Sequence, residues 1–358
     1  MPLHAVEDVD DAYRATRAFL WPADRTVWTK LALVVLFVAG PGGGYSGAQT
    51  SVPADSGPSG AIQSPATIGG AEWLVVAVIV GLIVVVGLAV LLVGSVMEFV
   101  LIESLRNETV TLRAYWGRRW RQGLRLFGFR LLIGLVFVGS TAVVAALILI
   151  PSAAGIGPGA GGGVSVATAL LLLPLIVVLG VVTGLIDGLT TVFAVPVMVH
   201  ENRTVLGAWR RLWPTITANL WQYLGYVVVS VVLNVVVGVL AALAVGVGAV
   251  VLLIPFGLLA AIGVLVATAV EPLGIGVVAL AALLFGVSLL AVAALVQVPF
   301  VVYLRYYALL VLGDIEESLD LIADRREAVR AADGAGGTEP NGVADDATPD
   351  EGRNRDDE

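Results

Sequence analysis

The lysine and arginine residues of this chain fall into four clusters, and three long stretches between the clusters contain none. These stretches are strongly apolar. Alternation of this kind is typical of multi-pass membrane proteins, whose basic residues collect in loops on the cytoplasmic side. The clusters cover residues 14–30, 106–130, 203–211 and 305–355, and the stretches between them cover residues 31–105, 131–202 and 212–304. The sequence therefore predicts an integral membrane protein.

The composition agrees with this interpretation. Only 13% of the residues are charged, whereas soluble domains carry about 25%. The net charge is −8, and most of it lies in residues 331–358, so acidity is a property of the tail. The chain has one lysine against 19 arginines and no cysteine. These features indicate a salt-adapted microbe with GC-rich codons, and codon bias alone is the alternative explanation.

We expect an all-α fold of about six transmembrane helices, arranged as three hairpin-like repeats with both termini in the cytoplasm. Each apolar stretch begins and ends beside a basic cluster, so each should contain an even number of crossings. The expected crossings are residues 28–40, 73–102, 126–150, 166–199, 219–243 and 275–304. Residues 245–270 then extend a long helix or form a re-entrant or outer interfacial element; four short crossings in this third stretch are the alternative.

The expected division of the chain follows from these crossings. Residues 1–27 form a cytoplasmic amphipathic segment, which lies along the membrane or in water. Residues 28–313 form the transmembrane domain, and residues 314–331 form a second cytoplasmic amphipathic helix. Residues 332–358 are rich in Gly, Pro, Asp and Glu, which predicts a disordered tail. The Gly-rich stretches 41–70 and 151–165 are expected to be external loops.

Two basic loops repeat a motif. NETVTLRAYWGRRW (107–120) and NRTVLGAWRRLW (202–213) share Asn-x-Thr-Val, a Trp, an Arg and a closing Trp. Three helix ends also correspond, namely MEFVLIE (97–103), VPVMVHE (195–201) and VPFVVYL (298–304). The pattern predicts three hairpins with similar cytoplasmic exits.

The sequences of these helix ends and loops resemble those of known membrane protein families. VPVMVHENRTVLGAWRRLW is similar to the cytoplasmic turn of a broad family that includes the membrane domain of glycerophosphoryl diester phosphodiesterases. The N-terminal AVEDVDDAYRATRAFLWP and the ending VPFVVYLRYYALLVLGD resemble an uncharacterised haloarchaeal membrane protein family. The resemblance implies a structural membrane domain. It does not bring phosphodiesterase activity, because no segment outside the expected crossings is long enough for a catalytic domain.

The residues offer little for catalysis. The only histidines are His4 and His200, and both are expected in the cytoplasm, so an external Ser–His site is excluded. His200-Glu201 lacks the second His of the zinc-protease motif. The Gly-rich stretches 40–44 and 157–163 lack the Lys and Ser/Thr of a phosphate-binding loop. We therefore expect no enzymatic activity, no cofactor and no metal.

Asp187 is the best single candidate for a functional residue, because an acid inside the membrane is costly. It lies within the small-residue series Gly180, Gly184 and Gly188, which favours close helix packing or oligomerisation. No Lys or Arg occurs in the apolar stretches, so we expect Asp187 to be protonated or bonded to Asn234 or Gln297. A proton- or ion-coupled role and a purely structural role both fit this pattern.

The basic loops are candidates for anionic lipid headgroups, because each Arg near the inner surface can add about 1 kcal/mol of attraction. Topology alone is the other explanation for these arginines. The candidate headgroup contacts are Arg113, Arg118, Arg119, Arg210 and Arg211.

The sequence as a whole favours a non-catalytic structural or accessory protein of the cell membrane. Its expected partners are the lipid bilayer and either another protein or a second copy of the chain, and no nucleic acid. A transporter that uses Asp187 and a lipid-modifying enzyme at the inner face are the alternatives.

Overall fold

A computed structural model describes residues 4–39, 70–153 and 166–336 of the chain. The described residues are helical, joined by turns and short connections. Five of their helices are long and apolar enough to cross a membrane, which supports a multi-pass membrane protein. Most of the expected external loops and of the expected disordered tail lies outside the described residues. The described parts are helical, because α3 begins at Gly70, α4 runs to Ala153 and α10 runs to Gly336.

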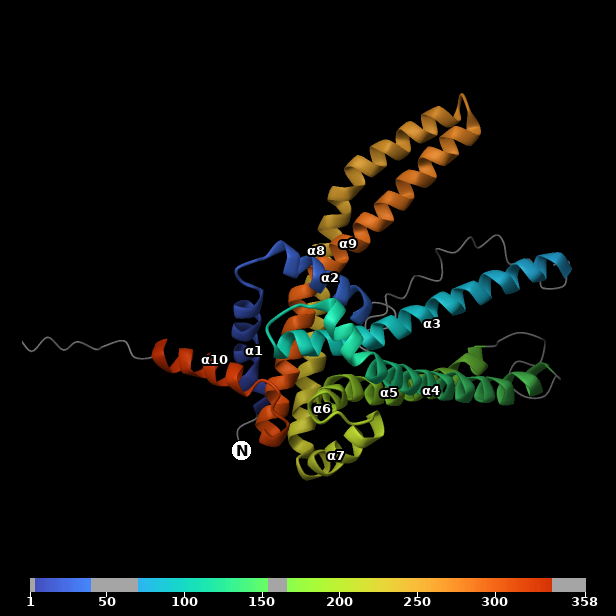
Figure 1. Ribbon diagram of the computed structural model, residues 1–358. Coiled ribbons are helices and arrows are strands. Elements are labelled where there is room, and N and C mark those ends of the chain that lie inside the picture. Colours follow the sequence, from blue (N-terminus) through green and yellow to red (C-terminus); the bar gives the residue numbers. More distant parts are fainter. Residues whose placement is uncertain (1–3, 40–69, 154–165, 337–358) are drawn as a thin grey trace, which may run out of the picture.

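The long helices leave a common centre in different directions (Figure 1). They form three groups. The first group is the single helix α3 (Gly70–Arg106), whose outer part extends alone. The second group is the pair α4 (Leu112–Ala153) and α5 (Val166–Leu189), which lie side by side. The third group is the pair α8 (Leu220–Ala267) and α9 (Glu271–Ile315), which form the longest hairpin.

Shorter elements surround the centre. The N-terminal helices are α1 (His4–Leu20) and α2 (Arg25–Val38). A π-helical turn, Thr190–Ala194, continues α5 into α6 (Val195–Glu201), and α7 (Val205–Ala218) follows. After α9 come a 3₁₀ turn (Glu317–Leu319) and α10 (Ala323–Gly336).

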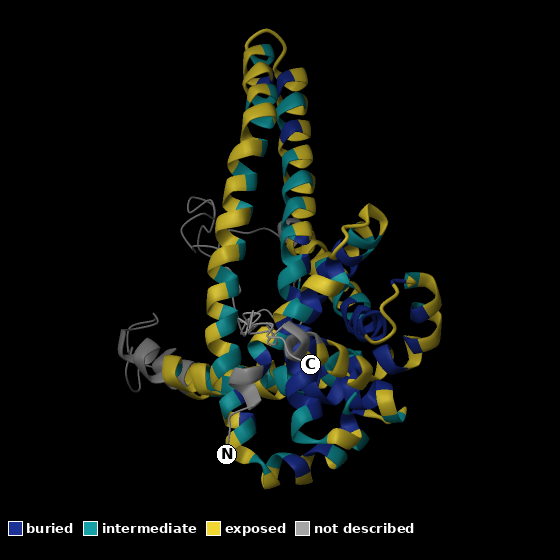
Figure 2. Ribbon diagram, turned by 90° about the vertical axis from the view of Figure 1, so that its left-hand side faces the viewer, coloured by how far each residue is buried: buried dark blue, intermediate teal, exposed yellow. Residues whose placement is uncertain are grey.

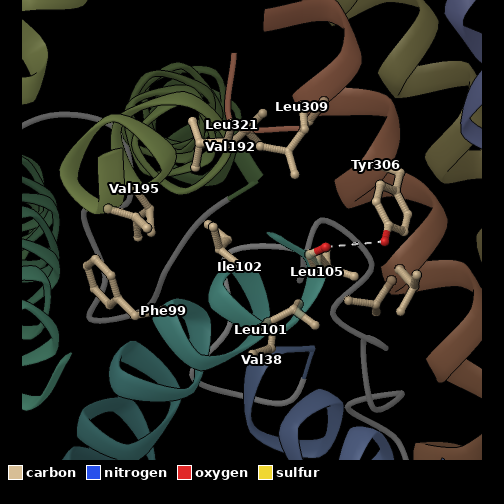
Figure 3. Close-up of a cluster of buried hydrophobic side chains, with 14 of the residues drawn as sticks. Val38, Phe99, Leu101, Ile102, Leu105, Val192, Val195, Tyr306, Leu309 and Leu321 are labelled. Carbon is tan, nitrogen blue, oxygen red and sulfur yellow. Dashed lines mark hydrogen bonds between the residues drawn. The ribbon is translucent and has the colours of Figure 1, made fainter. Parts of the chain in front are cut away.

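The buried core lies where the inner ends of the long helices meet. Figure 3 shows Phe99 and Ile102 of α3 facing Val192 and Val195 of the chain after α5, with Tyr306 of α9 nearby. The Tyr306 hydroxyl donates to the Leu105 carbonyl at 3.5 Å. These residues belong to or adjoin the three repeated helix ends, so the repeat marks the segments that pack together.

Figure 2 shows the opposite pattern along the outer parts of the long helices, where exposed residues dominate. Val84, Val236 and Leu283 are each at least half exposed to solvent. Exposed apolar side chains over this length need a lipid or protein covering. The five candidate spans thus differ from core helices of a soluble protein.

The third apolar stretch forms two helices, and residues 245–267 extend α8 without a break despite Gly246, Gly248 and Pro255. Of the alternatives for this segment, the long helix is the one observed. The expected first crossing is α2, whose 14 residues rise only about 21 Å. It packs in the core, with Leu31 and Val34 fully buried.

The two amphipathic segments pack on the core. Ala12 and Ala15 of α1 are fully buried, and Phe19 meets the Tyr306 ring edge-on at 6.0 Å between centroids. The helix expected over residues 314–331 is interrupted, because α9 runs to Ile315 and α10 begins only at Ala323.

Candidate functional site: a buried ion-pair network

Asp187 is paired with an arginine, contrary to the expectation that no basic residue could reach it. Arg130 of α4 donates from Nε to Asp187 Oδ1 at 3.1 Å and from Nη2 to Thr191 Oγ1 at 2.7 Å. The Arg130 side chain is 4% exposed and that of Asp187 is 26% exposed. Arg130 closes the second basic cluster in the sequence, and its long side chain reaches the neighbouring helix of the hairpin.

The π-helical turn is the hub of the network. The Val195 N–H bonds to the Thr190 carbonyl, five residues earlier. Pro196 follows this turn and has no N–H to donate, which favours the altered register. The Thr191 carbonyl accepts from Arg305 Nη1 of α9 at 2.8 Å. Thr191 is therefore contacted by arginines from two different hairpins.

Arg305 also joins α9 to α3. It forms an ion pair with Glu98, and both side chains are almost completely buried. Charges so deeply buried persist only when they are paired, because an isolated charge in a low-dielectric interior is very costly. These contacts thus connect all three groups of long helices through two arginines and two acidic residues. In order, the connected residues are Asp187, Arg130, Thr191, Arg305 and Glu98.

A second network lies beside the first basic loop. Arg119 donates to Glu103 Oε2 from Nη2 at 2.9 Å and to Asn202 Oδ1 from Nη1 at 3.0 Å. Gln122 donates to the Met198 carbonyl at 3.0 Å. Asn202 adopts a left-handed conformation with φ of 54°, which ends α6 and turns its side chain toward Arg119. The network holds the exits of the first two hairpins together.

The two basic loops have the same internal arrangement. Glu103 Oε1 lies 3.6 Å from Arg118 Nη1, and Glu201 Oε1 lies 3.7 Å from Arg211 Nε. In each case a glutamate at a helix exit pairs with an arginine on the helix that follows. The repeat found in the sequence therefore corresponds to repeated contacts.

The other two expected partners of Asp187 do not bond to it in the described part of the chain. Asn234 donates to the Ser230 carbonyl of its own helix at 2.7 Å. Gln297 lies on α9, with no hydrogen bond to α5 among the described residues. Gly184 and Gly188 face open space, because no atom lies within 4 Å of the position that a Cβ would take at either residue. This stripe therefore does not form a tight contact within the described residues.

The candidate headgroup arginines divide into two groups. Arg119 is buried in the network, and Arg211 is held by Glu201, Glu316 and Ser318. Arg118 is largely exposed but lies beside Glu103. Arg113 and Arg210 are exposed, and no described carboxylate lies within ion-pair distance of either. Of the five candidates, these two are the ones without an ion pair to any carboxylate in the described part of the chain.

A third charged cluster joins α1, the end of α9 and α10. Arg330 bonds to Asp8 at 3.1 Å, to Asp11 at 3.0 Å and to Asp314 at 2.6 Å. Burial of the Asp8 carboxyl raises its pKa to about 8, and the adjacent negative charge of Asp314 acts in the same direction. This shift favours the protonated form of Asp8.

These clusters are ion-paired rather than arranged as ligand sets. Among the described residues, no group of three or more His, Cys, Asp or Glu side chains could hold a metal ion. The carboxylates of both buried networks face arginines. The chemistry of the site is thus that of helix-to-helix attachment.

The comparisons with known proteins give a family and no relative of known activity. No curated protein matches the chain, and no solved structure matches it. The sequence profile of a family of unknown function, DUF7544, matches residues 3–322. That range covers the helices of the described structure up to the turn before α10. The chain is a member of this family.

Proposed function

We propose that this protein is a non-catalytic, multi-pass membrane protein with a structural or accessory role. One observation carries the proposal. The inner ends of the five long helices meet in one buried core, where charged side chains form ion pairs within the α4–α5 hairpin and between different groups of helices. The outer parts expose apolar side chains suited to lipid. Such an arrangement suits a protein that holds hairpins together at one membrane face.

The proposed topology has six crossings, with both termini in the cytoplasm. Arg330 of α10 bonds to Asp8 and Asp11 of α1, which supports the proposal that these two helices lie on one side. An even number of crossings must then separate them. Five long helices satisfy this condition if α2 supplies the sixth crossing, and its short length requires local thinning of the bilayer.

The transport alternative depends on a free or protonatable Asp187. Its contact with Arg130 favours a structural role, because the ion pair joins α4 to α5. A haloarchaeal source and a distant relationship to the phosphodiesterase membrane domain remain proposals that rest on the exit motifs. The absence of enzymatic activity is likewise part of the proposal.

Cysteine labelling tests the topology, because the native chain contains no cysteine. We expect Ala269→Cys, at the turn between α8 and α9, and Asp55→Cys to react only from outside. Ala328→Cys on α10 should react only from inside. Labelling of Asp55→Cys from inside would refute the six-crossing arrangement.

Mass spectrometry of the tagged protein, purified from its native membrane in matching salt, tests the role. A stoichiometric protein partner supports an accessory function. Retention of a specific solute, together with its loss in Asp187→Asn, would overturn the proposal in favour of transport.

A further inference from the structure

The repeated loops present two outward faces that the buried networks leave unused. Thr111 and Thr204 occupy equivalent positions, since each carbonyl accepts from the N–H four residues later, at 3.1 and 2.8 Å. Counting onward from these threonines, Trp116 corresponds to Trp209. Each of these tryptophans is half-buried and packs against the core.

The outward residues of the two loops correspond in part: in this register Trp120 aligns with Trp213, whereas Arg113 aligns with Leu206 and Arg210 with Gly117. On α4 they are Arg113 and Trp120, and on α7 they are Leu206, Arg210 and Trp213. We call these sets the α4 face and the α7 face. Trp120 is 38% exposed and Trp213 is 60% exposed. Each face thus combines one exposed Trp with one exposed Arg that has no described carboxylate partner.

An exposed Trp and an exposed Arg on one helix face suit the boundary between lipid headgroups and acyl chains. The indole ring favours that depth, with its N–H directed to water. The Arg stem covers apolar surface while its guanidinium reaches an anionic headgroup. The chemistry of both faces therefore matches a membrane surface more closely than a soluble partner.

The chain itself fixes the α7 face near the bilayer. Only Asn219 separates α7 from α8. Trp221, in the first turn of α8, is 80% exposed, and the apolar surface of α8 begins directly after it. The α7 face is thus continuous with the surface that lipid is proposed to cover. The Glu201–Arg211 contact on the opposite side of α7 attaches the helix to the core.

We propose that the α4 and α7 faces bind the inner leaflet, with Trp120 and Trp213 at the headgroup boundary and Arg113 and Arg210 on anionic lipid headgroups. This inference rests on the proposed membrane function and adds the class of ligand and the residues that contact it. The repeated loops then have two roles. Their inward residues join the hairpins, and their outward residues bind the core to anionic lipid.

Spin labels on the full-length protein in proteoliposomes test the position of the α7 face. The label is attached to Leu206→Cys, to Val236→Cys on the exposed surface of α8, and to Ala328→Cys on exposed α10. We expect position 236 in hydrocarbon, position 206 at headgroup depth and position 328 in water. An aqueous position 206 with an immersed position 236 overturns this inference alone, whereas an aqueous position 236 overturns the proposed function.

The lipid class is tested with nanodiscs of phosphatidylcholine alone or mixed with phosphatidylglycerol. We expect Arg113→Gln and Arg210→Gln each to lower the retention of phosphatidylglycerol by about fivefold at low salt. Arg17→Gln, on the exposed surface of α1, is the matched control and should have little effect. Equal losses in all three variants would indicate general charge attraction and overturn the assignment. Unchanged lipid retention with loss of a co-purified protein would assign the faces to that protein and also overturn it.

Discussion

The contact between α1 and α10 should weaken as the pH rises, because Asp8 must lose a proton that its surroundings hold. Burial, followed by the charge of Asp314 and a hydrogen bond with it, raises the pKa of Asp8 to about 8. Asp11 adds a further negative charge, and Arg330 opposes the shift. Above this pH, two adjacent carboxylates face each other at the junction of three helices.

The direction and size of this pH effect on stability follow from the number of protons that the folded and unfolded states bind. An ordinary Asp has a pKa of 3.8, so between that value and about 8 the folded state holds one more proton than the unfolded state. Stability then falls with rising pH by at most about 1.4 kcal/mol for each pH unit in this window. The contribution is complete below the ordinary value and is lost above the raised one. The pKa of about 8 already includes the opposing charge of Arg330, so the window between the two pKa values sets the upper limit of the effect.

Hydrogen exchange of the α1 amides, measured by mass spectrometry, tests this reasoning. The Asp8→Asn variant keeps an N–H that can donate to Asp314 and cannot lose a proton in this range. At each pH we compare wild type with Asp8→Asn, so the intrinsic exchange rate cancels. The exchange rate of the wild type divided by that of Asp8→Asn should rise by up to about tenfold for each pH unit toward pH 8 and then level off. Asp10→Asn, on the exposed pair with Arg14, is the control.

A ratio that stays constant across this range would refute the argument. It would mean that Asp8 is charged in the folded protein at neutral pH and that Arg330 fully stabilises it.

Three other substitutions have expected outcomes. Gly123→Ala would place a methyl group 2.5 Å from Val96 Cγ2 and 2.8 Å from its Cα, and should cost about 1–3 kcal/mol in thermal unfolding in detergent; Gly128→Ala, with open space around it, should be neutral or stabilising. Gly274→Ala would meet the Ala267 backbone at 2.2–2.3 Å and should lower the melting temperature, whereas Gly276→Ala should not. Arg130→Met leaves the Asp187 charge unpaired and should cost up to about 3–5 kcal/mol, whereas Arg130→Met with Asp187→Leu should cost less. An additive double-mutant cycle would contradict the pairing.

The distribution of charge along the sequence was enough to predict the class of fold. Apolar stretches without basic residues became the long helices, and parity of crossings favoured two helices in the third stretch, as α8 and α9 show. The repeated helix ends were also visible, because residues that pack in one core are constrained in similar ways. Local patterns of this kind survive in the sequence because neighbouring residues determine them.

The buried network was not predictable in the same way, because its contacts join residues far apart in the chain. Arg130 was placed at the inner end of a crossing, and Asp187 was expected to have no basic neighbour. The hairpin brings them within 3.1 Å, and only the packing angle between α4 and α5 decides this. Arg305 and Glu98 are separated by more than half of the chain. Nothing in either local sequence distinguishes a buried ion pair from an interfacial charge.

The length of the α8–α9 hairpin constrains how the core can sit in a membrane. The 48 residues of α8 rise about 72 Å, whereas the hydrocarbon of a bilayer is about 30 Å thick. A crossing along the membrane normal would therefore leave more than half of α8 outside hydrocarbon, although its surface is apolar throughout. Tilt reduces the mismatch but does not remove it, because a tilt of about 40° still leaves roughly 55 Å along the membrane normal. The hairpin leaves the core at an angle to α4 and α5 (Figure 1). Close contacts along its seam, such as Gly248 against Val292 and Gly263 against Val278, allow the two helices to tilt as one unit. Under the proposed membrane arrangement, the ion pairs at the inner ends would attach the diverging helices to one another through the core.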